Sequence, residues 1–510
     1  MIPKKTNLWI LSEERPKEEI VQYILERLAY DKNLSFFISN FAIVPVIYNQ
    51  KFTFTYQVIG IFSPQINNIF IKLVSGKSSF VDYLVFLQDN PPLPQDIPLY
   101  AIEETKTTSK DSRNTSVFQR ISKFIYLDIL YPKKEIKKIM LYNYERPDKR
   151  KKPKTFYFGL RLLKTLGVNI EFLNTSKQFK EEIDKIEAFK NIEELIKEKE
   201  SLSKSGPSHN TPLLIEKYEN KILIKAKLDK GNQAKFKGKL SHDPNIGAVS
   251  ALAAALRKLG WNKEIIVTDH GIKSISPKAK NKFIRIANCL NIKLNNLSIP
   301  EIKSNPTYWE YDLRSEKNVT ILTHITTEKF SNQSGQIIFE NHASSSLGFF
   351  ITADGRKISI GKNVPKPDLV IKDKKRKEII DIEGEKIQNI DKGRQQIADF
   401  KNFEEKYIKK YYPNYRIVQS LILYDDNRQK TIKNKQLLLL YKEISTLNLK
   451  SKRRSIYTNK KLRELISLTH LILSKEEEYA EIIINKTFCP QLIKESFENL
   501  FKFWQNTKQQ

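Results

Sequence analysis

The chain of 510 residues has only two cysteines, Cys289 and Cys489. Two thiols are too few for a disulfide framework or a thiolate zinc site, so we expect a protein of a reducing compartment, the cytoplasm. The six histidines are scattered without the spacing of metal ligands, which argues against a zinc finger. A glycine-rich phosphate loop ending in Lys-Ser or Lys-Thr is also missing, so ATP-driven translocation is not supported.

Long apolar runs are lacking as well. The longest such stretch, Phe36 to Tyr48, contains Ser39, Asn40 and Pro45 and is too short to cross a bilayer. The first ten residues lead directly into charged ones and lack the apolar core of a secretory signal. We therefore expect a soluble, intracellular protein with no membrane partner.

Positive charge is what the chain has in excess. Lys and Arg number 88 against 58 Asp and Glu, a net charge of +30, which is the sign expected of a protein that binds a polyanion. A coding bias toward Lys, Asn and Ile would produce part of the same excess. Hydrophobic residues at 40% and aromatic residues at 11% suffice for packed cores, so we expect a folded chain.

The local pattern changes from strands to a helix and back within the first third of the chain. Between residues 41 and 106, short runs rich in Val, Ile, Phe and Tyr are broken by Asn, Gly, Ser and Pro, which is typical of strands joined by turns. Phe118, Ile121 and Ile125 then recur at helical spacing, and 137–142 has the composition of another strand. This order predicts a strand-strand-helix-strand core.

A similar order returns near the C-terminus. An apolar hairpin begins at Asp368, a helix is predicted from Gly393 to Tyr411, where Pro413 stops it, and a strand is predicted over 416–424. Between the two cores, the pattern predicts one long charged helix over 178–204, a helix from 243 to 259 with Gly260 as its C-terminal cap, and a buried strand over 265–268.

Both predicted cores carry carboxylates on apolar strands, where an unpaired charge is costly. In the first, Asp82 precedes an apolar run, and Glu103, Glu104 and Lys106 close the strand that begins at Leu99. Side chains alternate along a strand, so Glu104 and Lys106 share one face and Glu103 points to the other. We expect Asp82 and Glu104 to bind a divalent metal, with Glu103 as a secondary candidate. Lys106 would orient or deprotonate a water.

The second set begins at Asp368, directly after Pro367, and ends in Glu383-Gly-Glu385-Lys386. Its lysine comes one position later than in the first set, so it is either a Glu-x-Glu variant with Glu383 and Glu385 in line or a degenerate site. We expect Asp368 and Glu383 to bind metal, with Glu385 and Lys386 as further catalytic candidates.

These two sets resemble the PD-(D/E)XK nuclease superfamily and, more narrowly, type II restriction endonucleases. The matching residues are Asp82 with Glu104-Thr-Lys106, although Val81 replaces the usual proline, and Pro367-Asp368 with Glu383-Gly-Glu385-Lys386. Such nucleases often carry a polar pair on the next helix, which makes Gln119 and Gln395 secondary candidates. The resemblance implies an α/β multidomain fold with two restriction-endonuclease-like cores, each a mixed sheet flanked by helices. It also implies a sequence-specific, Mg²⁺-dependent endonuclease that hydrolyses double-stranded DNA, and a companion DNA methyltransferase.

On this interpretation we divide the chain into an N-terminal nuclease-like domain (1–175), a charged helix and linker (176–212), a middle α/β region for DNA recognition or scaffolding (213–345), a C-terminal nuclease-like core (346–430) and a basic helical region (431–510). Two unlike cores suit an asymmetric site, with one core for each strand. A chain with a single site would need a symmetric homodimer to cut both strands, so both a monomer and a homodimer are open.

Basic residues concentrate in 133–154 and 430–461, with tyrosines interleaved, as contacts to DNA phosphates would require. A solvated surface is the alternative. The residues that we expect at DNA are Arg150, Lys151, Lys152, Lys452, Arg453 and Arg454.

Other functions stay open. One core could be catalytically active while the other only binds DNA, or the protein could bind nucleic acid without cutting it. A repair or homing nuclease is a further alternative. His242-Asp243 and Asp269-His270 could form an acid-base pair or a metal site, but the favoured explanation is that Asp243 caps its helix and the histidines face solvent or DNA.

Overall fold

The structure is a computed structural model. It describes residues 5–13, 15–48, 51–75, 80–106, 116–132, 134–143, 154–174, 177–204, 213–227, 239–240, 245–270, 274–275, 277–295, 307–311, 316–341, 349–360, 364–386, 389–425, 445–448, 468–473, 480–484 and 489–507.

The chain folds into two compact units, and both are mixed α/β, as the sequence predicted. Unit 1 comprises residues 1–7, 14–74 and 311–510, and unit 2 comprises residues 8–13 and 75–310. This division differs from the five segments expected from the sequence, because unit 1 combines elements from both ends of the chain. Among the helices of the described ranges, none is long and apolar enough to cross a membrane.

Among its described residues, unit 2 contains two larger sheets and a pairing of two short strands, 239–240 with 274–275. The first consists, in spatial order, of Leu8–Ser12 from β1 (Thr6–Ser12), β5 (Tyr83–Leu87), β6 (Tyr100–Lys106), β7 (Lys137–Asn143) and β8 (Asn169–Leu173). The first two pairings are antiparallel and the next two are parallel. Parallel neighbours need a crossover, and the helices α2 (Ser116–Leu130) and α3 (Lys154–Thr165) supply the two crossovers.

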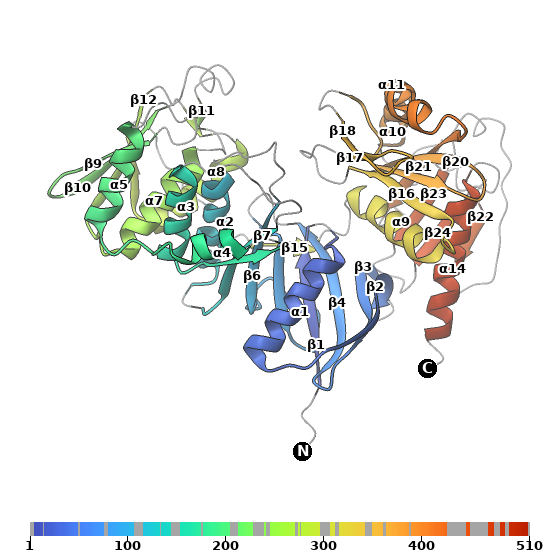
Figure 1. The fold of residues 1–510 in the computed structure, drawn as a ribbon, viewed down its shortest axis with the longest axis horizontal. Coiled ribbons are helices and arrows are strands. Elements are labelled where there is room, and N and C mark those ends of the chain that lie inside the picture. Colours follow the sequence, from blue (N-terminus) through green and yellow to red (C-terminus); the bar gives the residue numbers. More distant parts are fainter. Residues whose placement is uncertain are drawn as a thin grey trace. The chain divides into compact units, whose positions relative to one another are not determined.

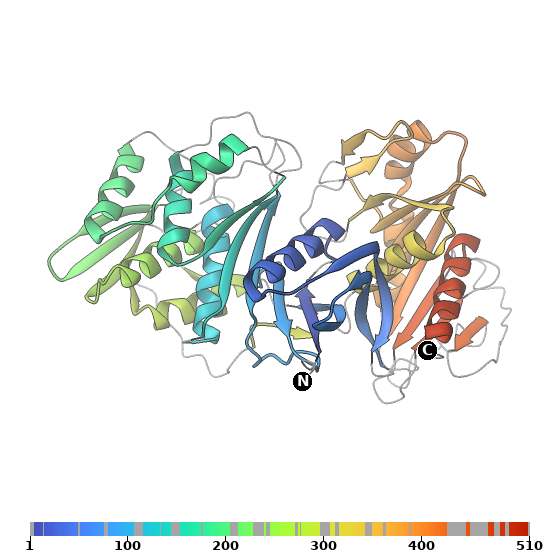
Figure 2. The same cartoon turned by 60° about the horizontal axis from the view of Figure 1, so that its bottom comes forward.

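The second sheet repeats this order of elements with β9 (Leu213–Lys217), β10 (Lys221–Lys227), α7 (Asn245–Lys258), β12 (Glu264–His270), α8 (Pro277–Cys289) and β14 (Ile292–Leu294). Again the hairpin is antiparallel and the later pairings are parallel. Figures 1 and 2 show the helices between the two sheets, where α2 packs against α7 and α8. Because both sides of α2 are covered, nearly all of its side chains are at least partly buried.

Unit 1 contains the antiparallel strands β2 (Phe37–Tyr48), β3 (Lys51–Phe62) and β4 (Ile66–Ser75), with α1 (Glu18–Lys32) before them. Its larger sheet has the spatial order β16 (Gly335–Glu340), β19 (Leu369–Asp373), β20 (Glu378–Lys386), β21 (Arg416–Asp425), β23 (Leu468–Leu473), β24 (Ala480–Ile484) and β22 (Ser445–Asn448). From β16 to β23 the pairings are antiparallel, antiparallel, parallel and parallel, as from β1 to β8 in unit 2.

Helices cover both faces of this larger sheet. Figure 1 shows α9 (Glu316–Phe330) and α14 (Gln491–Thr507) on one side, and α10 (Ile390–Ala398) with α11 (Lys401–Phe403) on the other. A π-helical segment, η2 (Glu404–Lys409), continues α11. Phe403, Phe339 and Phe350 form an aromatic core beside it with Tyr407.

The remaining elements are short or peripheral: α4 (Lys177–Asp184), α5 (Ile192–Lys204), β11 (Lys239–Leu240), β13 (Ser274–Ile275), β15 (Glu310–Tyr311), β17 (Phe349–Ile351) and β18 (Lys357–Ser359). The sequence predicted one helix over 178–204, where the structure has α4 and α5 with a break between them. The helix predicted from Gly393 to Tyr411 is interrupted by a turn at Asp399 and Phe400. The region 431–510, expected to be helical, contributes three strands before α14.

Candidate active site

In unit 2 the carboxylates of the first acidic set lie close together at the start of β5. Asp82 lies immediately before β5, and Tyr83 of that strand pairs with Ile102 of β6. The antiparallel register therefore places Asp82 opposite Glu103. Asp82 Oδ2 accepts a hydrogen bond from the Glu104 backbone N–H at 2.7 Å, which fixes the aspartate at the end of the hairpin.

The second acidic set, in unit 1, has the same arrangement. Asp368 lies immediately before β19, and the pairing of Leu369 with Ile382 places Asp368 opposite Glu383. Asp368 Oδ2 accepts the backbone N–H of Gly384, the residue after Glu383, at 3.1 Å. Glu103 and Glu383 are thus equivalent positions, and Lys106 and Lys386 both follow three residues later. The lysine that looked one position late in the second set alone is late in both.

This register bears on the roles expected in the first set. The two carboxylate oxygens of Glu104, our expected metal ligand, accept hydrogen bonds from Tyr83 Oη at 2.9 Å and Asn143 Nδ2 at 3.0 Å. Glu103, the secondary candidate, is the residue opposite Asp82, and the charge of Asp82 contributes to a raised pKa of Glu103. Lys106 ends β6, but its side chain and that of Gln119 lie outside the described part of the structure.

Positive side chains from α2 surround Glu103. Its side chain is 2% exposed, and Lys123 Nζ lies 2.8 Å from each carboxylate oxygen, with Arg120 Nε 3.3 Å from Oε1. Burial and the charge of Asp82 raise the pKa of Glu103 to about 7, although the two cations oppose that rise. Burial lowers the pKa of Lys123, but the charges of Glu103 and Asp82 outweigh it and raise that pKa overall. The pair is therefore a protein-supplied carboxylate–ammonium contact.

The second set carries more negative charge. Burial raises the pKa of Glu383 to about 9, and the charges of Asp368 and Glu385 add to that rise. The charge of Lys392 and a backbone hydrogen bond from Asp368 act in the other direction and lower the pKa of Glu383. Lys392 makes its ion pair with Glu385, whose other oxygen accepts Asn389 Nδ2 at 3.1 Å. Three carboxylates here face one ammonium group.

Sequence reasoning missed Lys392 and Asn389, which precede or begin α10 and reach back to Glu385. The only feature of the sequence that marks these two residues is their position, directly after the acidic strand and at the start of the helix that crosses over to β21. The predicted Gln395 is exposed and donates to Asp399 Oδ1 at 3.3 Å. Its neighbour Gln396 has a buried Oε1 without a hydrogen-bond partner in the described structure.

A buried carboxylate lies two residues before Glu383 on the same strand. Asp381 is fully buried, and neither of its oxygens has a hydrogen-bond donor among the described residues. Burial raises its pKa well above the usual value, and the nearby carboxylate of Glu404 adds to the effect. Gln419, the cross-strand neighbour of Asp381, donates to Glu404. Unit 2 has Ala101 at the equivalent position, so this buried acid belongs to the second set alone.

The two sets differ in how well they suit a divalent metal. Oxygen donors with excess negative charge are what Mg²⁺ requires, and the second set offers Asp368, Glu383 and Glu385. In the first set the carboxylate opposite the aspartate already has two protein cations as partners. Within the described residues, no group of three or more His, Cys, Asp or Glu side chains is already arranged to hold an ion.

Other predicted residues lie outside the described part of the structure. These are the expected DNA contacts Arg150, Lys151, Lys152, Lys452, Arg453 and Arg454, together with His242 and Asp243. Asp269 and His270 end β12, but their side chains are not described.

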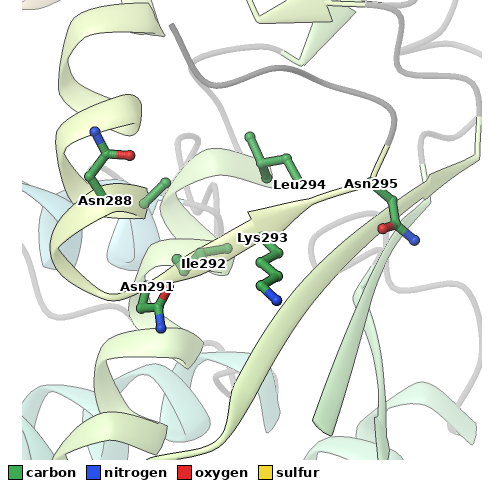
Figure 3. Close-up of a pocket in the computed structure, with 7 residues that line it drawn as sticks. Asn288, Asn291, Ile292, Lys293, Leu294 and Asn295 are labelled. Carbon is green, nitrogen blue, oxygen red and sulfur yellow. The ribbon is translucent and has the colours of Figure 1, made fainter. Parts of the chain in front are cut away.

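A hollow lies in unit 2, at the end of α8 and along β14 (Figure 3). Asn288, Asn291 and Asn295 line it together with Lys293, whose ammonium forms an ion pair with Glu264. This hollow contains none of the predicted site residues, so the acidic sets stay the candidates.

Comparison of the chain with protein-family models, with curated proteins and with solved structures finds no match.

Proposed function

We propose that the protein is a Mg²⁺-dependent endonuclease of double-stranded DNA whose active site is the set of Asp368, Glu383 and Glu385. The observation that carries the proposal is the convergence of three carboxylates at the end of one hairpin, where burial and the charges of Asp368 and Glu385 raise the pKa of Glu383 to about 9. A buried cluster of this kind is stabilised when a hard divalent cation binds. The positive charge of the chain, +30, is consistent with DNA as the substrate.

We assign a separate role in the reaction to each residue of the site. Asp368 and Glu383 would hold the metal, which would supply charge neutralisation and an acidified water. The Lys392 ammonium contacts Glu385 and is 58% exposed, so it can reach both that carboxylate and solvent. We assign it to orienting the attacking water, the role that the sequence analysis expected of Lys106 in the first set. Water adds to phosphorus, the bond to the leaving oxygen breaks, and that oxygen gains a proton.

The strand order supports placing both units with the restriction-endonuclease-like cores expected from the sequence. Each unit has an antiparallel pair that carries the Asp and Glu, then a helix, then parallel strands. Cutting at a defined sequence, as in a type II restriction enzyme, and a companion methyltransferase follow from that resemblance. They are proposals about biological role, which a fold does not determine.

The test is cleavage of supercoiled DNA by the full chain in Mg²⁺ or EDTA. Wild type should cut only with Mg²⁺, and Asp368→Asn and Glu383→Gln should be inactive. Glu405→Gln, on the exposed surface of η2, is the matched control and should cut as wild type does. Cleavage that survives both Asp368→Asn and Glu383→Gln would refute the assignment of this site.

A second candidate is a protein that binds nucleic acid without cutting it. The ion pair of Lys123 with Glu103 favours it, because it shows that one acidic set of this chain is already neutralised by the protein itself. Salt-sensitive DNA binding with no cleavage under any metal condition would establish this second function.

A further inference from the structure

We propose that Lys123 and Arg120 occupy the place of a divalent cation in the first acidic set, so that each chain has one metal centre and cuts one DNA strand. The inference about metal stands on the geometry of unit 2. The inference about strand cutting rests on the proposed function.

The first acidic set lacks a carboxylate that the second set has. Equivalent registers align Glu103 with Glu383, so the residue two positions later on the same strand face is Thr105 in unit 2 and Glu385 in unit 1. The first set therefore has a hydroxyl where the second has an acid. A set reduced to Asp82 and Glu103 has fewer hard anionic donors for Mg²⁺.

The carboxylate of Glu103 in the first set already contacts two cations of the protein. Lys123 Nζ lies 2.8 Å from both oxygens of Glu103, and Arg120 adds a third contact at 3.3 Å. The side chains of Lys123 and Arg120 are 19% and 22% exposed, whereas Lys392 in the second set is 58% exposed. The cations of the first set are thus enclosed, and the cation of the second set is open to solvent.

Packing and a hydrogen bond to α8 hold α2, the helix that carries both cations, in place. Phe118 and Ile121 of α2 are buried, and Lys282 of α8 donates to Ser122 Oγ at 2.8 Å. The helix is packed against α7 and α8, and Lys123 and Arg120 contact Glu103 from this helix. A metal could enter only if two held cations were displaced from a packed interior.

The neighbouring acids are also already engaged. Asp82 accepts the Glu104 N–H, and Glu104 accepts both Tyr83 and Asn143. These hydrogen bonds, which come from uncharged donors, fix the end of the hairpin. We therefore assign the first set a structural role. Cutting both strands then requires two active chains at one DNA site, because one metal centre processes one strand.

The experiment counts bound Mn²⁺ on the full chain by electron paramagnetic resonance, with wild type, Glu103→Gln, Asp82→Asn and Glu383→Gln. The expected count is one ion for wild type, Glu103→Gln and Asp82→Asn, and none for Glu383→Gln. Circular dichroism of each variant verifies folding, and Asp82→Asn keeps the test valid where Glu103→Gln fails to fold. Two ions in wild type with one lost in Glu103→Gln or Asp82→Asn would overturn the inference.

Strand cutting gives a second, separable readout. At low enzyme concentration, supercoiled DNA with one site should accumulate as nicked circles, and the rate of conversion to linear DNA should rise with enzyme concentration. Direct linearisation at the lowest concentration would overturn the one-strand inference. No bound Mn²⁺ and no cleavage in wild type would refute the proposed function itself, which is a different result from two ions.

Discussion

Glu103 and Glu383 occupy the same position in two separate sheets, each opposite the aspartate that precedes its hairpin. Their surroundings are opposite in charge. Glu103 contacts an ammonium and a guanidinium group, whereas the pKa of Glu383 is raised by burial and by two further carboxylates. One hairpin geometry therefore supports both an internal ion pair and an electronegative site.

The role of Glu385 can be separated from general effects on β20. Glu385→Gln removes one of the charges that act on Glu383 and breaks the ion pair with Lys392. We expect a loss of Mg²⁺-dependent cleavage of at least about 100-fold, since loss of outer partners alone costs about 10–100-fold at metal sites. Glu378→Gln, the same change at the other end of the strand, should have little effect. Steady-state cleavage rates of the two variants provide the measurement.

Close packing of α10 against β20 is needed to position Glu385. A Cβ at Gly393 would lie 2.7 Å from Leu421 Cδ1 and 3.3 Å from Glu385 Cγ. Gly393→Ala should therefore shift the helix, lower the free energy of unfolding by about 1–3 kcal/mol and weaken Mn²⁺ binding. Gly159→Ala, which overpacks Val117 in unit 2 at 2.6 Å, is the control. It should lose stability and keep its Mn²⁺ affinity, so equal affinity losses in both variants would contradict the prediction.

Much of the fold near the sites could be predicted from apolar spacing. Phe118, Ile121 and Ile125 correctly predicted α2, and the strand predicted over 137–142 is β7. Gly260 adopts a φ of 96° just after α7, as its predicted capping role requires. Spacing could not reveal the interruption after α10, because the aromatic contacts of Phe403 with Phe339 and Phe350 are made by segments distant in sequence.

The site was harder to predict because it depends on strand register. Alternation correctly separates Glu103 from Glu104, but it does not say which of them faces Asp82. That choice is made by the pairing of Tyr83 with Ile102 across a long connection, which a single sequence does not encode in any local pattern. Lys123 and Lys392 enter from helices, so no short motif contains them together with the acids.

The ion pair of Lys123 with Glu103 should contribute to the free energy of unfolding by an amount that depends on pH. Lys123→Met leaves Glu103 buried with less compensation, and breaking a buried pair costs about 3–5 kcal/mol. The pKa of Glu103 is already about 7, so at pH 6 this carboxyl is mostly protonated and needs less compensation. The loss should therefore be large at pH 9 and small at pH 6 in urea unfolding. In a Glu103→Gln background, a similar loss at pH 9 would show that the pair is not its cause.

The buried acid Asp381 should make the protein less stable as pH rises. Its pKa in the folded state is raised well above the ordinary value by burial and by Glu404, whereas the unfolded chain releases this proton near pH 4. Above about pH 4 the folded state therefore binds more protons than the unfolded state, and stability falls as pH increases toward the folded pKa.

Asp381→Asn removes this titration, so the variant should gain stability over wild type as pH rises. The gain is about 1.4 kcal/mol for each pH unit over which Asp381 alone stays protonated in the folded state. Urea unfolding at pH 5 and pH 8, in EDTA, measures it. Asp373→Asn on β19 is the matched control, because Asp373 is also fully buried but forms an ion pair with Arg376 and accepts backbone N–H groups. Its loss should destabilise the protein at both pH values, and a pH-independent effect of Asp381→Asn would contradict the assigned shift.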